Sequence, residues 1–477
     1  MQYSIAPEIF KAYDIRGIVG KTLNRDTIRL IASAYATQAH QQRVNQLAVG
    51  CDGRLSGPEI KSDLINALLQ SGLDVVDIGQ VTTPMLYFAA LSQANGSGIM
   101  ITGSHNPPQY NGFKLMLAKH TLAGEDISAL YRLITQKQLT CLDKRGQCFV
   151  YDITKDYIQA IVNDIDLKRA LKIVVDAGNG IAGRHIGRLY RALGCEVVEL
   201  FCDVDGHFPN HHPDPAKPEN LTDLIKAVQE HQAEVGLAFD GDADRLGVVT
   251  KSGEIIYPDR LLALFASEIL KKHSGAVICY DVKCTRLLEP WIRQRGGQPL
   301  LSRTGHSHIK AAMKKNKALL AGEMSGHLFF ADRWPGFDDG IYAGARLLSI
   351  LSRTEDASKT LERLPKAFST PELTIALSYE GEGHALIKRL QQTAKFNQAQ
   401  QVVTIDGLRV EYTDGFALIR ASNTVPALVL RFEGDNRGSL QQIQKDFIKA
   451  VSPLLSEPLL NQLRVLIESC SKKLKNT

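Results

Sequence analysis

Residues 98–114, GIMITGSHNPPQYNGFK, contain the pattern that decides the fold class. The run from Ile99 to Thr102 is apolar and rich in β-branched residues, which is typical of a buried strand. It ends at Gly103, which lets the backbone turn at little steric cost. The strand therefore delivers Ser104 onto a tight loop, and we expect this serine to be presented at the surface rather than buried. For the loop taken alone, an ordinary turn is the alternative interpretation.

Strand and helix patterns alternate on the N-terminal side of this loop. Strand-like runs lie at 46–50, 73–78 and 99–102, and helical patterns lie at 26–35, 58–71 and 84–93. This β-α-β-α-β order predicts a doubly wound α/β sheet, in which ligands bind beyond the carboxyl ends of the strands. Ser104 follows such an end, so a ligand is expected beside it.

Similar beginnings recur along the chain. Apolar runs that close on an aspartate and a polar loop occur at 47–53, 173–180 and 276–283. Their spacing, about 100 to 125 residues, suggests three related α/β domains, although α/β strands can also look alike by chance. The last part differs, because strand-like runs between 402 and 432 precede a helical pattern from about Ser439. It predicts a smaller α+β domain with an antiparallel sheet.

The predicted fold class is therefore α/β, with three related doubly wound domains and a smaller C-terminal α+β domain. Boundaries are expected where polar or Gly/Pro-containing stretches interrupt the pattern. They give segments 1–151, 152–252, 253–369 and 370–456, followed by a helical tail at 457–477 that we expect to be frayed. A length of 477 residues suits three or four domains.

Composition narrows the class of protein. A hydrophobic content of 44% and a charged content of 22% are those of an ordinary globular protein. The net charge of +5 comes without a Lys/Arg block, so no nucleic-acid partner is expected. There is no signal-peptide pattern and no apolar run of about 18 residues, so we expect a cytoplasmic protein without a membrane partner. The eight cysteines include no C-x-x-C pair, which argues against a zinc site or a disulfide framework.

The run DGDADR, from Asp240 to Arg245, lies between two apolar runs and carries the strongest chemical signal. In an extended loop alternate side chains point the same way, so the three aspartates Asp240, Asp242 and Asp244 would share one face. Their charges repel unless a cation lies among them, and oxygen ligands favour Mg²⁺ or Ca²⁺. An EF-hand is excluded, because its sixth and twelfth positions need Gly and Glu and are here Arg245 and Lys251. A solvated acidic turn is the alternative. Mg²⁺ usually completes its shell with phosphate oxygens, so a phosphorylated partner is expected.

Two further loops suit a sugar phosphate. GEMSGH at 322–327 offers donors and acceptors for neighbouring sugar hydroxyls, with a polar turn or a helix cap as the alternative. RASNT at 420–424, with Arg431 on the following strand, would bind an anion because Arg matches phosphate geometry. A hairpin with cross-strand charge pairs is the alternative there. Lys114, Lys283 and the run 303–306 form a looser set, whose members are more often structural.

Together these features imply phosphoryl transfer between an enzyme serine and a sugar. The motifs TGSHNP at 102–107, DGDADR at 240–245, GEMSGH at 322–327 and RASNT at 420–424, in this order and spacing, resemble the α-D-phosphohexomutase family over residues 1 to about 455. The resemblance implies four domains around a central cleft, each contributing one loop. It implies an isomerase that interconverts hexose 1-phosphate and hexose 6-phosphate through a phosphoserine and a bound 1,6-bisphosphate. Mg²⁺ would be the cofactor and glucose 1,6-bisphosphate the activator.

The resemblance also implies roles for single residues. Ser104 would be the phosphoserine, and its phosphate would bind Mg²⁺ together with Asp240, Asp242 and Asp244. The sugar hydroxyls would be read by Glu323, Ser325 and His327. The non-reacting phosphate would be held by Arg420, Ser422, Asn423, Thr424 and Arg431. The transferring phosphate would be surrounded by Arg16, Lys114, Arg245, Lys283 and His306, of which Lys114 and His306 are candidates for proton transfer; Tyr13 would contact substrate.

Met324 and Gly103 resemble the bacterial phosphomannomutase/phosphoglucomutase branch, which implies mannose or glucose phosphates as substrates. Phosphoglucosamine mutases typically carry Gln and Ala at these two positions, and that activity is the alternative within the family. A non-catalytic phosphosugar-binding protein and a Mg²⁺-dependent phosphatase are the alternatives outside it. We expect a monomer or a small homo-oligomer.

Overall fold

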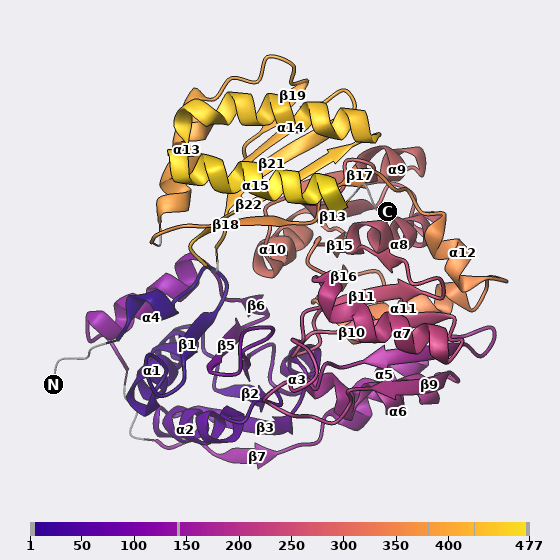
Figure 1. Cartoon of the computed structure of the whole chain (residues 1–477). Coiled ribbons are helices and arrows are strands. Elements are labelled where there is room, and N and C mark those ends of the chain that lie inside the picture. The colour runs from indigo at the N-terminus through magenta and orange to yellow at the C-terminus, as the bar shows by residue number, and fades with distance from the viewer. Residues whose placement is uncertain (1–4, 141–143, 380, 424, 474–477) are drawn as a thin grey trace. The chain divides into compact units, whose positions relative to one another are not determined.

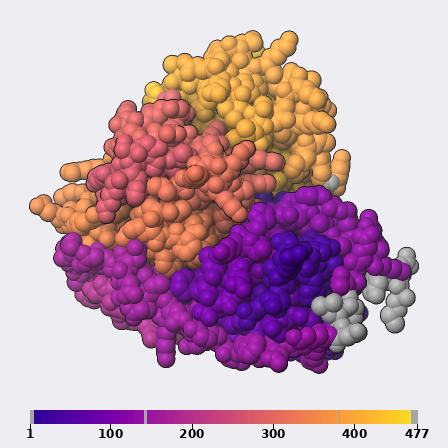
Figure 2. All heavy atoms as spheres, turned by 180° about the vertical axis from the view of Figure 1, so that it is seen from behind, coloured from indigo at the N-terminus to yellow at the C-terminus, as the bar shows by residue number. Residues whose placement is uncertain are grey.

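A computed structural model describes residues 5–140, 144–379, 381–423 and 425–473 (Figure 1). The chain forms two compact units, one made of residues 1–265 and 319–364 and the other of residues 266–318 and 365–477. In Figure 2, coloured by residue number, residues beyond about 400 gather in one continuous body on the face shown. No helix in the described ranges is long and apolar enough to cross a membrane.

The first sheet of the first unit positions the Ser104 loop. Parallel strands run in the order β4 (Gly98–Ile101), β2 (Gln46–Cys51), β3 (Asp74–Gln80) and β7 (Cys148–Val150). Helices α2 (Gly57–Gln70) and α3 (Thr83–Gln93) connect them, which confirms the predicted β-α-β-α-β order. Beyond β4 the sheet continues through β5 (Tyr110–Leu117) and β1 (Ile15–Ile18), both antiparallel to their neighbours. The sheet is mixed because the loop after β4 is too short for the crossover helix that a parallel strand needs.

Alternation along β2 explains how this sheet is covered. Leu47, Val49 and Cys51 point into one core, which they share with α1 (Arg25–Gln41), α2 and α4 (Glu125–Thr135). Helix α3 packs on β2 and β4. Residues that alternate in direction along the strand thus bury both faces of the sheet, which leaves the strand ends as the place for exposed polar side chains.

The second sheet positions the aspartate loop. Its order is β12 (Ile255–Ile256), β11 (Leu246–Thr250), β10 (Val235–Phe239), β8 (Lys172–Asp176) and β9 (Glu196–Leu200). Strands β10 and β8 are parallel, whereas β11 returns antiparallel to β10. The run DGDADR is the connection between β10 and β11. In the same unit, β15 (Leu320–Gly322) and β16 (Leu328–Phe330) form an antiparallel hairpin whose loop carries the run 323–327.

The second unit contains a parallel pair, β13 (Val277–Asp281) and β14 (Gln298–Ser302), followed by α10 (His306–Asn316). It also contains an antiparallel sheet in the order β17 (Phe368–Ser369), β22 (Ala427–Gly434), β21 (Gly415–Ala421), β20 (Leu408–Tyr412) and β19 (Gln401–Val403). Strand β18 (Leu373–Ala376) also pairs with β22. Figure 1 shows α14 (Arg437–Val451) lying across this sheet, as expected for an α+β arrangement.

The C-terminal helix differs from the expectation of a frayed tail. Helix α15 (Glu457–Lys473) places Leu463 and Ile467 in the core of the antiparallel sheet. Leu463 is fully buried. The apolar stripe of this amphipathic helix therefore docks rather than faces water.

Candidate active site

Ser104 lies directly after β4, on a loop that folds against the aspartate loop. Its φ of 48° is left-handed, and it is only 4% exposed, so the prediction of an exposed serine is wrong. Its Oγ donates to Asp240 Oδ2 at 3.1 Å. Close approach of the two loops buries the hydroxyl: a Cβ at Gly241 would lie 2.4 Å from the Ser104 carbonyl oxygen. Only glycine permits this contact.

His105 flanks the Ser104 hydroxyl, with Nδ1 lying 3.2 Å from Oγ. Burial, together with the positive charges of Arg245 and Arg16, lowers the pKa of His105 well below its usual value. The imidazole is therefore neutral near pH 7. The sequence motif contained His105, but its contact with the serine was not predicted.

Arg54 is the main support of the loop and was not predicted as a site residue. Its side chain is 1% exposed, and its two terminal nitrogens donate to four backbone carbonyls of the loop. The acceptors are the carbonyl oxygens of Ser104 at 2.8 Å, Asn106 at 2.5 Å, Pro107 at 2.8 Å and Tyr110 at 2.9 Å. A guanidinium is suited to this because its donors are fixed in a planar fork.

Asp52 joins this support from the end of the neighbouring strand β2. Its Oδ2 accepts from Thr102 Oγ1 at 2.7 Å and from the Gly103 nitrogen at 3.2 Å, and it pairs with Arg54 at 3.4 Å. Thr102 Oγ1 in turn accepts from the Ser104 nitrogen at 2.7 Å. The available signal was topological: β2 and β4 are parallel neighbours, so their carboxyl ends meet at one edge.

The structure brings the three aspartates together. Asp240, Asp242 and Asp244 are all fully buried, and each has a carboxylate oxygen within 4.8 Å of one on each of the others. The loop is not extended as predicted, because it forms a turn in which Ala243 has a φ of 63°. The turn, rather than strand-like alternation, converges the carboxylates.

Lys114, from β5, neutralises part of this charge. Its Nζ donates to Asp242 Oδ2 at 2.7 Å and also contacts Asp244 Oδ2. Burial would lower the pKa of Lys114, but the charges of Asp242 and Asp244 raise it well above its usual value. Lys114 is therefore protonated in this state. Thr83, at the start of α3, donates from Oγ1 to Asp242 Oδ2 at 2.5 Å.

The protonation of the aspartates differs. Burial and the charges of Asp244 and Asp242 raise the pKa of Asp240 well above its usual value. Burial also acts on Asp244, but Lys114 and His327 offset it and lower the pKa of Asp244 well below its usual value. When no cation is bound, Asp240 is thus the aspartate of this group whose ionisation costs the most free energy.

The chemistry of this group fits Mg²⁺. All its ligand atoms are carboxylate oxygens, and Asp242 Oδ1 accepts no hydrogen bond from the described residues although it is buried. Asp244, His327 and Asp338 form a second, overlapping group of possible ligands. That group includes an imidazole nitrogen, and Mg²⁺ prefers oxygen, so the three aspartates fit Mg²⁺ better.

The hairpin loop between β15 and β16 meets the aspartate loop. His327 Nδ1 lies 2.9 Å from Ser325 Oγ and 3.4 Å from Glu323 Oε2, and its Nε2 lies 3.3 Å from Asp244 Oδ1. Arg245 Nε donates to His327 Nε2 at 3.4 Å and lies 3.7 Å from Asp240 Oδ2. The predicted sugar loop and the predicted metal loop are therefore parts of one polar network.

Arg16 reaches the Ser104 loop from β1. Its Nη1 donates to the Thr102 carbonyl oxygen at 3.1 Å, and its Nη2 pairs with Asp14. Tyr13 precedes β1 and is buried, with 8% of its surface exposed. Arg16 thus joins Ser104, Lys114, Arg245, the three aspartates and the sugar loop in the first unit.

The second unit holds the residues that were predicted to bind the non-reacting phosphate. Arg420 on β21 lies opposite Val429, and Arg431 on β22 lies opposite Leu418. Residues opposite each other, or two apart on one strand, share a face, so both guanidiniums lie on one face of the sheet. Arg431 Nη1 donates to the carbonyl oxygen of Lys283, which brings the lysine to the same group.

Asp406 links this group to the run 303–306. Its Oδ2 accepts from Arg420 Nε at 3.0 Å and from the Thr304 nitrogen at 2.9 Å. His306 is the first residue of α10 and is 7% exposed. Ser422 Oγ accepts from the Val425 nitrogen at 3.4 Å, and Asn423 Oδ1 lies 3.3 Å from His384 Nε2. Thr424 lies outside the described residues.

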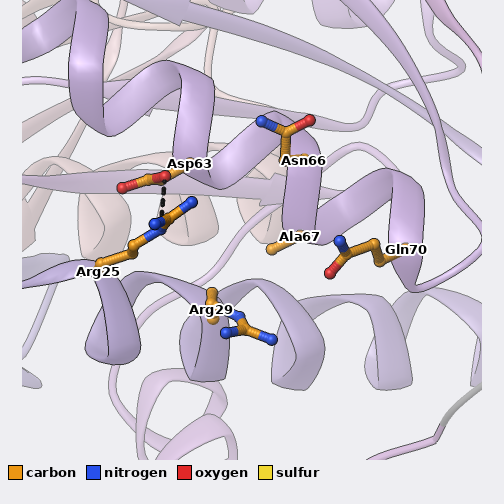
Figure 3. A pocket seen from close by; sticks show the side chains of 6 residues that line it. All are labelled: Arg25, Arg29, Asp63, Asn66, Ala67 and Gln70. Atoms are coloured by element: carbon orange, nitrogen blue, oxygen red, sulfur yellow. Dashed lines mark ion pairs between the residues drawn. The ribbon is translucent and has the colours of Figure 1, made fainter.

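A separate polar pocket lies on the surface between α1 and α2 (Figure 3). Its one ion pair among the residues drawn joins Arg25 Nε to Asp63 Oδ1 at 3.1 Å. The lining residues are Arg25, Arg29, Asp63, Asn66, Ala67 and Gln70. None of them is a predicted site residue, so the candidate site is the network around Ser104.

Comparison with known proteins agrees with this geometry. Four family models match in chain order: phosphoglucomutase/phosphomannomutase alpha/beta/alpha domains I, II and III at residues 7–140, 155–253 and 257–368, and the C-terminal domain at 377–450. The chain belongs to the phosphoglucomutase/phosphomannomutase family. The resemblance to the α-D-phosphohexomutases, and the fold class of three α/β domains and a C-terminal domain, are thereby confirmed.

Relatives within the phosphoglucomutase/phosphomannomutase family cover nearly the whole chain. A phosphoglucomutase of Neisseria meningitidis is 56% identical over 96% of this chain and 100% of its own length. A phosphomannomutase/phosphoglucomutase of Pseudomonas aeruginosa is 50% identical over 95% of this chain and 98% of its own. A crystal structure of a family protein from Burkholderia thailandensis, 53% identical, matches with a TM-score of 0.90 over 94% of this chain and 98% of that chain. Such relatives identify the chain as an isomerase of the phosphosugar mutase type.

Proposed function

We propose that this mutase interconverts the 1- and 6-phosphates of mannose, glucose or both, through a phosphoserine at Ser104. The observation that carries the proposal is the 3.1 Å hydrogen bond from Ser104 Oγ to Asp240, within a buried group of three carboxylates. A serine beside a divalent-cation site suits reversible phosphorylation. The names of the relatives, phosphoglucomutase and phosphomannomutase/phosphoglucomutase, support the two hexoses.

The residues around Ser104 have separate tasks in this mechanism. Arg54 and Asp52 fix the loop, and Asp240, Asp242 and Asp244 would hold Mg²⁺ with an oxygen of the phosphoserine. Bound there, Mg²⁺ would neutralise charge on the transferring phosphate. Arg16 and Arg245 supply further positive charge: Arg16 donates to Thr102 beside the Ser104 loop, and Arg245 donates to His327.

Proton transfer accompanies the phosphoryl transfer. The sugar hydroxyl loses a proton as it attacks phosphorus, and Ser104 Oγ becomes the leaving oxygen and gains one. Lys114 holds its proton beside Asp242 and Asp244, so it fits a donor or a source of positive charge better than a general base. His105, neutral and 3.2 Å from Ser104 Oγ, fits a proton acceptor when the serine hydroxyl attacks phosphorus, and the imidazolium so formed can return the proton when the hydroxyl is regenerated.

The second phosphate of the bisphosphate requires its own binding group. Arg420 and Arg431 suit it, because two guanidiniums on one face match phosphate oxygens. We assign Lys283 to the same phosphate, although the family resemblance placed it at the transferring one, because its carbonyl oxygen accepts from Arg431. The bisphosphate turns end for end, so each phosphate occupies each place once in the cycle. Glu323, Ser325 and His327 would read the sugar hydroxyls in both orientations. Glucose 1,6-bisphosphate would serve as the activator that charges Ser104.

The deciding experiment measures formation of mannose 6-phosphate from mannose 1-phosphate, and of glucose 6-phosphate from glucose 1-phosphate, with Mg²⁺ and a trace of glucose 1,6-bisphosphate. Turnover is expected with at least one hexose. The Ser104→Ala variant should bind sugar phosphate and lose nearly all turnover. Wild-type turnover confined to glucosamine phosphates would replace the proposed substrates, and steady release of inorganic phosphate would identify a phosphatase.

A further inference from the structure

The three cationic side chains that are proposed to bind the non-reacting phosphate already have carboxylate partners in the protein. Each faces a carboxylate: Arg420 pairs with Asp406 at 3.0 Å, Arg431 lies 3.9 Å from Glu433, and Lys283 Nζ donates to Glu372 at 2.9 Å. All three cations are buried, with exposed fractions of 3 to 6%. Unpaired buried charges are costly, so the carboxylates stabilise the group when it holds no phosphate.

Two of the three carboxylates are fixed by backbone hydrogen bonds. Asp406 also accepts from the Thr304 nitrogen at 2.9 Å, and Glu433 accepts from the Arg286 nitrogen at 3.1 Å. Glu433 is in addition fully buried. Neither side chain can leave its cation without breaking these bonds, so both are structural partners.

Glu372 is more exposed and less firmly held than Asp406 and Glu433. Its side chain is 43% exposed, and its one ion pair in the described structure is the bond to Lys283. It follows Pro371, on the connection between β17 and β18, and so is not part of a strand. Partial burial of the carboxylate would raise the pKa of Glu372, but the charges of Lys283, Arg420 and Arg431 lower it below its usual value. The carboxylate therefore senses the charge of all three cations, while in the described structure it is hydrogen-bonded to Lys283 and to no backbone nitrogen.

We propose that Glu372 is a resident counter-ion of the phosphate-binding cations, which the non-reacting phosphate of the substrate displaces. The proposal rests on the proposed function, because it assumes that Lys283, Arg420 and Arg431 bind the non-reacting phosphate. An exposed carboxylate on a short connection can leave at small cost, since exposed ion pairs contribute little. A phosphate dianion carries more charge and more acceptors and replaces it.

This exchange suits a mutase in particular. The bisphosphate must release this phosphate in order to turn, and release leaves Lys283 without a counter-ion, whereas Arg420 and Arg431 keep Asp406 and Glu433. Return of Glu372 to Lys283 compensates part of that charge, so the carboxylate weakens binding and speeds release. Glu372 is thus a positioning residue that acts through Lys283, and it sets the balance between affinity and turnover.

The test compares Glu372→Gln with the wild type and with Glu289→Gln, full-length in each case. Glu289 pairs with Arg293 on the exposed helix α9 (Leu288–Gln294), so its variant makes the same chemical change away from the site. We expect Glu372→Gln to bind inorganic phosphate and glucose 1-phosphate about fivefold more tightly, to lower KM, and to lower kcat. Glu372→Asp keeps the charge and should stay closer to the wild type.

Binding is measured by calorimetry in a Ser104→Ala background, which prevents turnover, and kcat and KM are measured in the chain with Ser104. Unchanged or weaker phosphate binding by Glu372→Gln, with active wild type, would overturn the inference while leaving the proposed function intact. A wild type that neither binds nor converts hexose phosphates would overturn the proposed function, and the inference with it. If Glu289→Gln tightened phosphate binding as much as Glu372→Gln, the effect would come from net charge alone, and the inference would again be overturned.

Discussion

Arg54 Nη2 donates a hydrogen bond to the carbonyl oxygen of Ser104 at 2.8 Å. The donor comes from the end of β2 and the acceptor from the loop after β4, fifty residues along the chain. The same guanidinium donates to three further carbonyls of the loop. The conformation of the Ser104 loop is therefore fixed by a residue that contacts its backbone rather than the serine hydroxyl.

Replacing Arg54 by Lys should reduce kcat at least about 100-fold and change KM little. A single ammonium cannot reach four carbonyls, so several buried acceptors would lose their donors at about 1 to 3 kcal/mol each. Steady-state kinetics and thermal unfolding measure the two effects. Lys61→Arg, a substitution in an ion pair with Asp77, is the control and should leave both unchanged. Full activity of Arg54→Lys would contradict a role in positioning Ser104.

Replacing Asp242 by Asn should raise the Mg²⁺ concentration required for half-maximal activity about tenfold or more. The amide offers one neutral oxygen where the carboxylate offers a charged one, and Asp242 Oδ1 is free of hydrogen bonds from the described residues. A Mg²⁺ titration of the rate measures the change. Asp63→Asn, in the surface pocket of Figure 3, is the matched control. A titration that matches the wild type would exclude Asp242 as a metal ligand.

The strands at the site were predictable because they are apolar over their whole length. The two apolar runs that flank DGDADR are β10 (Val235–Phe239) and β11 (Leu246–Thr250), and every residue in them is buried. Polar residues that interrupt such runs must lie at strand ends, so the aspartate loop was predictable as well. The sequence pattern also predicted that Arg420 and Arg431 lie on consecutive strands.

The burial of Ser104 and the role of Arg54 were not predictable in the same way. Ser104 is buried because Gly241, in another sheet, allows the two loops to touch, and no local pattern encodes that contact. Arg54 binds backbone carbonyls, which every residue type carries, so its partners leave no trace in side-chain spacing. Contacts between distant loops depend on how the sheets pack, which periodicity does not describe.

Replacing Gly241 by Ala should lower kcat about tenfold or more. The added Cβ would lie 2.4 Å from the Ser104 carbonyl oxygen, so one loop must move and the serine shifts relative to Asp240. KM should change less, because Arg420 on β21 and Arg431 on β22, which are proposed to bind phosphate, are untouched. Gly57→Ala is the control, since its Cβ would meet only ordinary contacts from 3.4 Å. Equal kcat values for the two variants would show that loop contact does not position Ser104.

Asp339 connects two aromatic side chains, Tyr157 and Trp334, with helix α11 (Gly340–Leu351). As the N-cap of that helix it accepts from the Tyr342 nitrogen at 2.8 Å, and it also accepts from Tyr157 at 2.8 Å and from Trp334 Nε1 at 3.1 Å. Burial raises the pKa of Asp339 to about 7. The hydrogen bonds do not fully offset the cost of burying its charge.

Asp339 should therefore contribute to the pH dependence of stability. Between about pH 4 and about pH 7 the unfolded chain has lost the proton and the folded chain keeps it, so the free energy of unfolding falls as pH rises, by up to about 1.4 kcal/mol per unit. Asp339→Asn, which keeps a capping oxygen, should make this slope less steep by the share of one carboxyl, up to about 1.4 kcal/mol per pH unit, in urea unfolding at several pH values. Asp356→Asn is the matched control, because hydrogen bonding from the Lys359 nitrogen lowers the pKa of that N-cap, so its effect lies below about pH 4. A slope unchanged in Asp339→Asn would mean that Asp339 is ionised in the folded protein across this range.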